Sequence, residues 1–304
     1  MEIVSESVNQ YPYKALLIIN PVSGKKTVLR HIPYIIRSLM DKGYLVTTAV
    51  TSRKGEANEL SEKYAAQFDL ICCTGGDGTL NETLSGIACA GVSVPLGYIP
   101  CGSTNDFAAT HSLSADIQTA ADRMAGGTCK SYDIGCFGKS YFSYVAAFGA
   151  FSWLSYTTDQ NLKNVLGHTA YILDAIKDLY KIKPIRMKVV ANGITYEDEF
   201  IFGAVCNSTS IAGTIELPRS MVSTCDGKLE VLLIKMPKTI IDLDLIIRGI
   251  VTQDYSGPFL ELFQASELDI YNPDLNEWSL DGEFCPSFES VHVSVMPEFL
   301  KLKS

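Results

Sequence analysis

Short continuous runs of apolar residues recur along the first hundred positions, and stretches with helical spacing lie between and after them. The runs are at 15–20, 44–50, 68–73 and 94–99. Runs of this kind are typical of parallel strands that are buried on both faces. Helices are predicted within 28–39, 55–67, 80–90 and 115–124. The alternation predicts an α/β fold with a doubly wound parallel sheet, which binds ligands at the carboxyl ends of its strands.

The pattern changes after a predicted hinge at Gly126-Gly127. Strands are predicted at 132–135, 141–151, 186–191, 195–205, 228–235, 262–271, 278–284 and 290–296, and helices near 168–180 and 238–251. Asn192-Gly193 predicts a tight hairpin, and Asp226-Gly227 is a second hairpin-like position. We therefore expect two domains, 1–129 and 130–304, of which the second is mostly antiparallel β. Whether residues 297–304 return to the first domain is left open.

Composition narrows the class of protein. The chain has 304 residues, 47% of them hydrophobic, and a formal net charge of −9, which argues for a globular protein and against nucleic acid as its partner. Nine cysteines without a C-x-x-C pair and four scattered histidines indicate a reducing compartment and no zinc site. The N-terminus lacks a signal-peptide pattern, and the longest apolar stretch, 141–154, is too short to span a bilayer. We expect a cytoplasmic protein with no transmembrane segment.

The segment T-G-G-D-G-T-L-N-E at 74–82 sets three glycines around Asp77, between a predicted strand and a predicted helix. Backbone N–H groups and the positive end of a helix meet at such a turn, and phosphate binds there. Asp77 does not hold phosphate itself because like charges repel, so it needs a metal, a water or a proton in transit. The alternative is an ordinary glycine turn with Asp77 as helix cap. Three glycines followed by Thr79, Asn81 and Glu82 favour the phosphate site.

Two more strand ends carry polar turns. The first, N-P-V-S-G-K at 20–25, is a second phosphate-facing turn with Lys25 as counter-charge, or else a plain loop; it is not a Walker A loop. The second is P-C-G-S-T-N-D-F at 100–107. Backbone amides around Gly102 and the Ser103 hydroxyl are candidates for binding phosphate or ribose, while Asn105 and Asp106 are alternatively turn and cap residues.

The motifs G-G-D-G-T, N-P-x-S-G and P-x-G-[TS]-x-N-D-F together resemble those of the diacylglycerol kinase catalytic domain family, and bacterial soluble lipid kinases in particular. Sphingosine kinases and, more distantly, NAD kinases and phosphofructokinases share the first motif. The resemblance implies an NAD kinase/phosphofructokinase-like first domain that binds ATP. It also implies a nucleotide contact for Thr51, whose hydroxyl alternatively serves a cap or loop. The predicted nucleotide-binding residues are Asn20, Ser23, Gly24, Lys25, Thr51, Gly75, Gly76, Asp77, Gly78, Thr79, Asn81, Gly102, Ser103 and Asn105.

Asp281-Gly282-Glu283 by itself predicts a hairpin turn with an exposed glutamate. The resemblance implies that Glu283 is the catalytic proton acceptor. Asp77 is the second predicted catalytic residue and organises metal-bound water, alone or together with Asp106 and Asp133. Bacterial relatives also bind Mg²⁺ at positions that match Asp226 and the carbonyls of Ser223 and Lys228. Cys225 stands where those relatives have a further Asp. The sequence therefore does not decide whether this chain has the Mg²⁺ site.

The resulting hypothesis is a kinase that transfers the γ-phosphate of ATP to a lipid alcohol at the membrane surface, with Mg²⁺ as cofactor. Diacylglycerol is the first choice; a sphingoid base, phosphatidylglycerol or a polyprenol are other lipids, and a homodimer is left open. An NAD kinase and a non-catalytic nucleotide-sensing protein are the alternatives. The aromatic stretch 141–153 either feeds an apolar cleft for the lipid or, as we favour, belongs to the core sheet.

Overall fold

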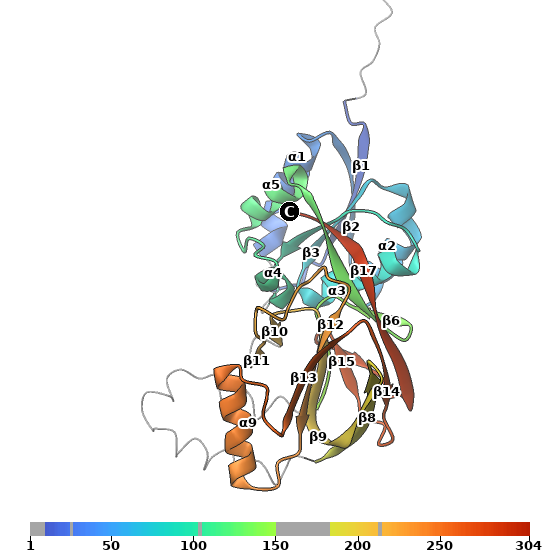
Figure 1. Ribbon diagram of the computed structural model, residues 1–304. Coiled ribbons are helices and arrows are strands. Elements are labelled where there is room, and N and C mark those ends of the chain that lie inside the picture. Colours follow the sequence, from blue (N-terminus) through green and yellow to red (C-terminus); the bar gives the residue numbers. More distant parts are fainter. Residues whose placement is uncertain (1–9, 25–26, 103–104, 150–182, 212–214) are drawn as a thin grey trace, which may run out of the picture. The chain divides into compact units, whose positions relative to one another are not determined.

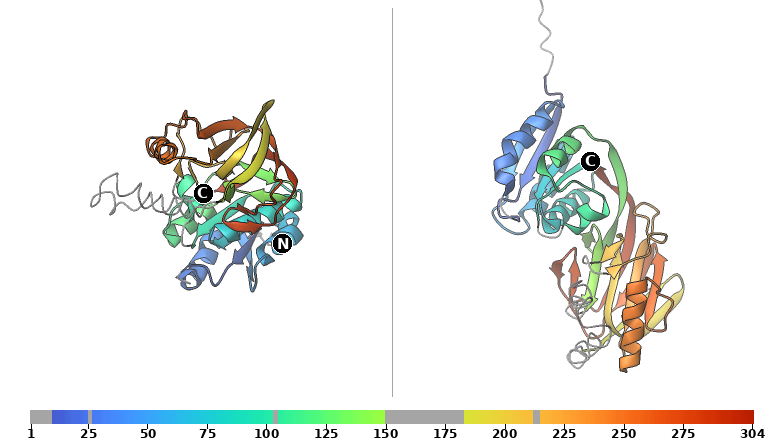
Figure 2. Two further views of the ribbon diagram at one scale, coloured as in Figure 1. Left: turned by 90° about the horizontal axis from the view of Figure 1, so that it is seen from below. Right: turned by 90° about the vertical axis from the view of Figure 1, so that its left-hand side faces the viewer.

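The computed structural model describes residues 10–24, 27–102, 105–149, 183–211 and 215–304. The chain divides into two compact units, whose elements are labelled in Figure 1 and seen from two further sides in Figure 2. The first unit runs to Tyr132 and includes Phe299–Ser304, and the second is Asp133–Glu298. Strands β5 (Cys129–Phe137) and β17 (Ser290–Lys303) therefore contribute residues to both units.

The first unit is built on a parallel sheet, as the alternating apolar runs predict. Its strands in spatial order are β2 (Tyr44–Val50), β1 (Tyr13–Ile19), β3 (Leu70–Gly75), β4 (Leu96–Pro100) and the end of β17. In β17, Leu302 and Lys303 pair in parallel with Leu96 and Gly97 of β4. The C-terminal residues therefore return to this sheet and lie next to β4.

Helices cover both faces of the parallel sheet (Figure 1). On one face α1 (Ile32–Met40) and α5 (Ile117–Gly126) pack together and bury side chains of β1 and β3. On the other face α2 (Glu56–Tyr64) packs closely against α3 (Asp77–Cys89). Gly86 permits this approach, because a Cβ there would lie 2.7 Å from Cβ of Ser61. The remaining helices are η1 (Thr27–His31), η2 (Ala65–Gln67) and α4 (Asp106–Thr110).

The second unit is mainly antiparallel β, as predicted. Its main path of neighbouring strands is β16-β15-β7-β9-β8-β14-β17, with β12 paired to β9 and β13, and β5 paired to β6. The strands are β6 (Ser140–Phe142), β7 (Val145–Gly149), β8 (Ile185–Ala191), β9 (Ile194–Cys206), β10 (Ser210–Ile211), β11 (Ile215–Glu216), β12 (Leu229–Lys235), β13 (Leu260–Ala265), β14 (Glu267–Tyr271), β15 (Trp278–Leu280) and β16 (Glu283–Cys285). Helix α9 (Ile240–Thr252) begins with a capping box formed by Thr239 and Asp242.

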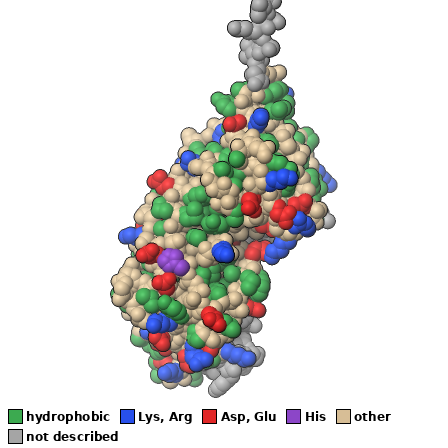
Figure 3. Space-filling model, turned by 90° about the vertical axis from the view of Figure 1, so that its right-hand side faces the viewer, with side chains coloured by type: hydrophobic (Ala, Val, Ile, Leu, Met, Phe, Trp, Pro, Cys, Tyr) green, Lys and Arg blue, Asp and Glu red, His purple; other side chains and the backbone are tan. Residues whose placement is uncertain are grey.

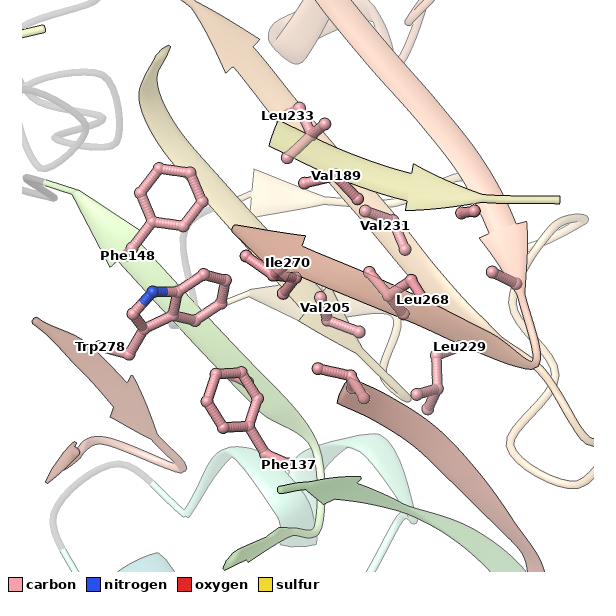
Figure 4. Packing of buried hydrophobic residues seen from close by; sticks show 14 of the residues in the cluster. Phe137, Phe148, Val189, Val205, Leu229, Val231, Leu233, Leu268, Ile270 and Trp278 are labelled. Atoms are coloured by element: carbon pink, nitrogen blue, oxygen red, sulfur yellow. The ribbon is translucent and has the colours of Figure 1, made fainter. Parts of the chain in front are cut away.

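Apolar and aromatic side chains from these strands form the core of the second unit (Figure 4). The Trp278 ring lies 4.8 Å from the ring of Phe148 and 5.1 Å from that of Phe137, measured between centroids. Phe142 and Phe148 of the aromatic stretch are buried. Over 141–149 this stretch therefore belongs to the core sheet, as we favoured, and residues 150–153 lie outside the described part of the chain.

The hairpin predicted at Asn192-Gly193 is confirmed. Both residues have positive φ angles, 53° and 75°, and Ala191 pairs with Ile194 across the turn. A two-residue turn of this type matches the twist of the strands that it joins. It connects β8 to β9.

Several predicted elements need correction. The single strand expected at 262–271 is two strands, β13 and β14, which separate at Ser266 and pair with different partners. The strand expected at 278–284 is the hairpin β15–β16. Asp226-Gly227 precedes β12 but joins no hairpin, because β12 pairs with β9 and β13. The helix predicted at 168–180 lies outside the described residues.

Candidate functional site

Three loops at the carboxyl ends of β1, β3 and β4 contact one another through glycines. A Cβ on Gly102 would lie 2.6 Å from Cα of Gly76, and a Cβ on Gly24 would collide with the carbonyl oxygen of Cys101. Gly24 also has a φ angle of 52°, which favours glycine. Side chains at these positions would push the loops apart. The structure thus brings the three predicted strand-end motifs together at one edge of the parallel sheet.

The turn between β3 and α3 is tighter than the sequence predicts. Gly75 is the last residue of β3, Gly76 is the N-cap of α3, and the helix begins at Asp77 rather than at Leu80. Gly76 offers no side chain to cap the helix, and helix geometry leaves the first N–H groups, including that of Gly78, without intrahelical acceptors. The N-terminus of this 13-residue helix is chemically suited to phosphate oxygens.

Asn20 joins the N-P-V-S-G-K loop after β1 to the glycine turn after β3. Its Nδ2 donates a hydrogen bond to Oγ1 of Thr79 at 2.9 Å, and its Oδ1 accepts one from the amide of Val22 at 3.1 Å. The second bond closes the turn that carries Ser23. Asn20 and Thr79 therefore hold the two loops in register with each other, while Lys25 lies outside the described residues.

The carboxylate of Asp77 accepts hydrogen bonds from backbone amides, contacts that the sequence pattern does not predict. Oδ2 accepts from the amide of Asp106 at 3.1 Å and Oδ1 from that of Phe107 at 3.4 Å. These amides belong to the first two residues of α4, where the sequence predicted turn and cap residues. Asp77 thus links the glycine turn to the N-D-F motif. Burial raises the pKa of Asp106 beside it.

Asn105 closes the loop after β4. It has a left-handed φ of 56°, its Oδ1 accepts from the amide of Gly102 at 2.9 Å, and its Nδ2 donates to the carbonyl of Gly102 at 2.9 Å. The Gly102 amide therefore has a partner within its own loop, and the predicted binding of phosphate or ribose by the amides around Gly102 stays a prediction. The geometry favours the turn interpretation of Asn105, and Ser103 lies outside the described residues.

Thr51 ends β2 and is buried. Its amide and its Oγ1 both donate to the carbonyl of Ile19, at 2.9 and 3.3 Å. The hydroxyl therefore has a structural partner, as the loop alternative expected. Its predicted contact with nucleotide stays a prediction.

Glu82, in the second turn of α3, holds the loop that follows Thr51. Its carboxylate accepts hydrogen bonds from the amides of Gly55 at 2.8 Å and Ala57 at 3.3 Å. Gly55 is the N-cap of α2 and carries no side chain, so Glu82 caps that helix from outside. No local sequence pattern predicts this role, because the hydrogen bond joins residues 27 positions apart. Its neighbour Asn81 is half-buried on the same helix.

In the second unit, Asp281 and Gly282 form the turn between β15 and β16, with φ angles of 50° and 84°. Leu280 pairs with Glu283, which opens β16 and is half-buried. The hairpin predicted from Asp-Gly is therefore present. Asp281, however, is 3% exposed, and its carboxylate accepts hydrogen bonds from the backbone of β7 and the residues before it. A turn aspartate is ordinarily exposed, so no local sequence pattern predicts this role.

The predicted metal ligands lie on the loop before β12, and Asp133 holds that loop in place. Oδ2 of Asp133 accepts from the amide of Gly227 at 2.7 Å, its Oδ1 accepts from that of Glu298 at 2.7 Å, and its own amide donates to the carbonyl of Thr224 at 2.8 Å. Asp133 is buried and both of its oxygens have backbone donors. The arrangement supports a structural role rather than one in orienting metal-bound water.

Asp226 is exposed on this loop, where one of its oxygens accepts from the amide of Lys228 at 3.1 Å. No cluster of three or more His, Cys, Asp or Glu side chains suited to a metal occurs among the described residues. A set made of the Asp226 carboxylate and the carbonyls of Ser223 and Lys228 is nevertheless of the oxygen type that Mg²⁺ accepts. The donor chemistry of these residues therefore fits Mg²⁺.

Glu230 of β12 follows the loop that carries Asp226. It is fully buried beside Gln264, its partner on β13. Nε2 of Gln264 donates to Oε1 of Glu230 at 3.1 Å and to the carbonyl of Met221 at 2.7 Å. Burial raises the pKa of Glu230 to about 7. Gln264 thereby connects the sheet to the first residues of the loop.

The chain is similar in sequence to known kinases. Residues 14–137 match the family described as the diacylglycerol kinase catalytic domain, and a diacylglycerol kinase of Bacillus subtilis (strain 168) is 28% identical over 296 residues, 94% of this chain and 97% of that protein. Residues 14–137 belong to the diacylglycerol kinase catalytic domain family. Kinases of this family use ATP.

Other members of the family agree with this assignment. A diacylglycerol kinase of Staphylococcus haemolyticus is 32% identical over 200 residues, which are 66% of this chain and 61% of that protein. Among solved structures, a diacylglycerol kinase from Bacillus anthracis str. Sterne superimposes with a TM-score of 0.76 at 24% identity, covering 96% of each chain. At this identity the structural likeness confirms the fold alone.

Proposed function

We propose that this chain is an ATP-dependent lipid kinase that phosphorylates the hydroxyl of a lipid alcohol, and that diacylglycerol is its substrate and phosphatidic acid its product. The observation that carries the proposal is the nearly full-length relationship to the Bacillus subtilis diacylglycerol kinase. The convergence of three glycine-containing loops around the N-terminus of α3 supports the nucleotide-binding part of the proposal.

Phosphoryl transfer requires a phosphate held in line with the attacking hydroxyl, neutralised charge and removal of one proton. We assign Glu283 as the group that accepts the proton of the lipid hydroxyl. The freed oxygen forms a bond to the γ-phosphorus while the bond from that phosphorus to the β,γ-bridging oxygen breaks, which leaves ADP. The residues that would hold ATP are Asn20, Ser23, Gly24, Lys25, Thr51, Gly75, Gly76, Gly78, Thr79, Asn81, Gly102, Ser103 and Asn105.

Charge neutralisation is assigned to Mg²⁺, which stabilises the negative charge on the transferred group when it is bound. Asp226, with the carbonyls of Ser223 and Lys228, is the set of residues that would hold it. Asp77 keeps its predicted catalytic role in this proposal, beside the structural role that its two backbone hydrogen bonds give it.

The reaction is placed at the cytoplasmic membrane surface. None of the helices in the described ranges is long and apolar enough to cross a bilayer. The face in Figure 3 carries acidic and basic side chains interspersed among apolar ones, and the net charge of the chain is −9. Neither feature favours bulk electrostatic attraction to anionic lipid, so contact with the membrane would be peripheral and guided by the lipid substrate.

Labelled ATP offered with a panel of lipid alcohols tests the proposal. The panel contains diacylglycerol, a sphingoid base, phosphatidylglycerol and a polyprenol, with NAD as a water-soluble competitor, and products are identified by mass. Phosphatidic acid as the main product supports the proposal. Phosphorylated NAD would establish an NAD kinase instead. If no acceptor is phosphorylated, the proposal fails and a nucleotide-sensing protein is the remaining alternative.

A further inference from the structure

The carboxylate of Asp281 accepts four hydrogen bonds from residues 143–145. Its Oδ2 accepts from the amide and the hydroxyl of Ser143 at 2.6 and 2.8 Å, and its Oδ1 accepts from the amides of Tyr144 and Val145 at 3.0 Å each. The amide of Asp281 in turn donates to the carbonyl of Val145 at 2.8 Å. Asp281 and Ser143 are both buried. Hydrogen bonds from several donors to a buried carboxylate are strong and fix its position.

The hairpin that carries Glu283 needs such an anchor. Strands β15 and β16 have three residues each, and β16 is the edge strand of its path. Hairpins this short are marginally stable by themselves. At its far end the hairpin is held by Trp278, whose ring packs in the core. At the turn, next to Glu283, it is held by the bonds between Asp281 and residues 143–145.

We propose that Asp281 is a positioning residue for Glu283: its buried carboxylate fixes the turn of the β15–β16 hairpin on residues 143–145 and thereby fixes the place of the proton acceptor. This inference rests on the proposed function of Glu283. It gives the aspartate of the D-G-E motif a task of its own beyond forming a turn. Displacement of a reacting group by about 1 Å typically reduces turnover about a hundredfold, so such an anchor matters for rate.

Three variants test the proposal. Asp281→Asn keeps the size of the side chain and its tolerance of a positive φ, but it places an NH₂ group against N–H donors. Ser143→Ala removes one of the four bonds and leaves the turn sequence intact. Asp269→Asn is the matched control, because it removes the same charge from an exposed position on β14 of the same unit.

The first measurement does not need activity. Hydrogen–deuterium exchange of the full-length wild-type chain and the variants follows the peptides that cover 143–149 and 278–285. We expect faster exchange in both peptides for Asp281→Asn, a smaller change for Ser143→Ala and none for Asp269→Asn. Wild-type exchange in Asp281→Asn would overturn the anchoring, and if that variant does not fold, unchanged exchange in Ser143→Ala would do the same.

The second measurement separates positioning from general stability. At a temperature where all the variants are folded, we expect kcat of Asp281→Asn to fall about tenfold to a hundredfold, with the KM for ATP within about twofold of the wild-type value. Ser143→Ala should lose about threefold to tenfold in kcat. An active wild type whose folded Asp281→Asn variant keeps the wild-type kcat overturns the positioning role alone. A wild-type chain that phosphorylates no lipid overturns the proposed function itself.

Discussion

At the scale of single residues, the polar side chains of the motifs mostly bind backbone groups of this chain. Asp77 accepts from the amides of Asp106 and Phe107, Asn105 bonds both polar atoms of the Gly102 backbone, and Glu82 caps α2. Asp and Asn at loop ends are well suited to this, because their short side chains reach neighbouring amides. The motif residues therefore build the loops as well as any ligand site that the loops form.

Asp77→Asn separates the two roles of Asp77. One oxygen of the carboxylate is replaced by an NH₂ group that meets an N–H donor of α4, so we expect the free energy of unfolding to fall by about 1–2 kcal/mol, besides a loss of turnover. Urea unfolding measures the first effect and the kinase assay the second. Unchanged stability would show that the bonds to α4 contribute nothing, and would leave Asp77 with a purely chemical role.

His111 gives the chain a specific pH dependence. Its ring lies between those of Phe107 and Tyr132, with centroids 4.2 Å from each, and burial lowers its pKa to about 4. An unfolded histidine binds a proton below about pH 6.5 while the folded one stays neutral, so stability falls as the pH drops from 6.5 towards 4.

His111→Phe keeps an aromatic ring in place and removes this titration. Between pH 7 and pH 5, protonation of His111 in the unfolded state should lower the unfolding free energy of the wild type by about 1–2 kcal/mol. The variant lacks this contribution, so its unfolding free energy should fall by about 1–2 kcal/mol less than that of the wild type. Urea unfolding at the two pH values measures the difference. His292→Gln, on the exposed face of β17, leaves the buried ring intact and is the control. Equal pH dependence in His111→Phe and wild type would contradict the assignment.

At the scale of elements, the position of α3 depends on close packing against α2. A Cβ on Gly86 would lie 2.7 Å from Cβ of Ser61 and 2.8 Å from the amide nitrogen of Glu62, and neither contact is relieved without moving a helix. Since Glu82 on α3 also caps α2, the two helices carry the glycine turn and the loop after Thr51 as one assembly.

Gly86→Ala should therefore force α2 and α3 apart. Overpacking of this kind destabilises proteins by about 1–3 kcal/mol, and we expect a rise in the Kd for ATP together with a lower Tm. Gly257→Ala is the matched control, because Gly257 has open space around its missing Cβ and no positive φ. Thermal unfolding and nucleotide titration of both variants check the expectation, which fails if the two alanines behave alike.

At the scale of the whole molecule, the proposed reaction draws on both units. The phosphate-facing loops belong to the first unit, and Glu283 and the loop 221–228 belong to the second. Nucleotide binding and proton removal should therefore be separable by mutation, since the residues assigned to them lie in different units.

Glu283→Gln tests this separation. The side-chain amide of glutamine does not accept a proton at neutral pH, so turnover should fall by at least about a hundredfold. The Kd for ATP should stay at its wild-type value. Isothermal titration with ATP and the lipid kinase assay give the two numbers. Wild-type-like turnover would refute Glu283 as the base, and lost ATP binding would show that it acts on the nucleotide instead.

The sequence by itself determined the fold class and the place of the first-unit loops, because apolar runs, helical spacing and glycine turns are local properties of the chain. The parallel sheet, the Asn192-Gly193 hairpin and the location of three motifs at strand ends all follow from them. Tertiary structure decided what local patterns do not contain. It paired the Gly102 amide with Asn105, bound Asp77 to α4 and split the predicted strand at Ser266. It also buried Asp281 against donors from residues 136 to 138 positions away. Such partners are set by which segments pack together, and that packing is a property of the folded chain.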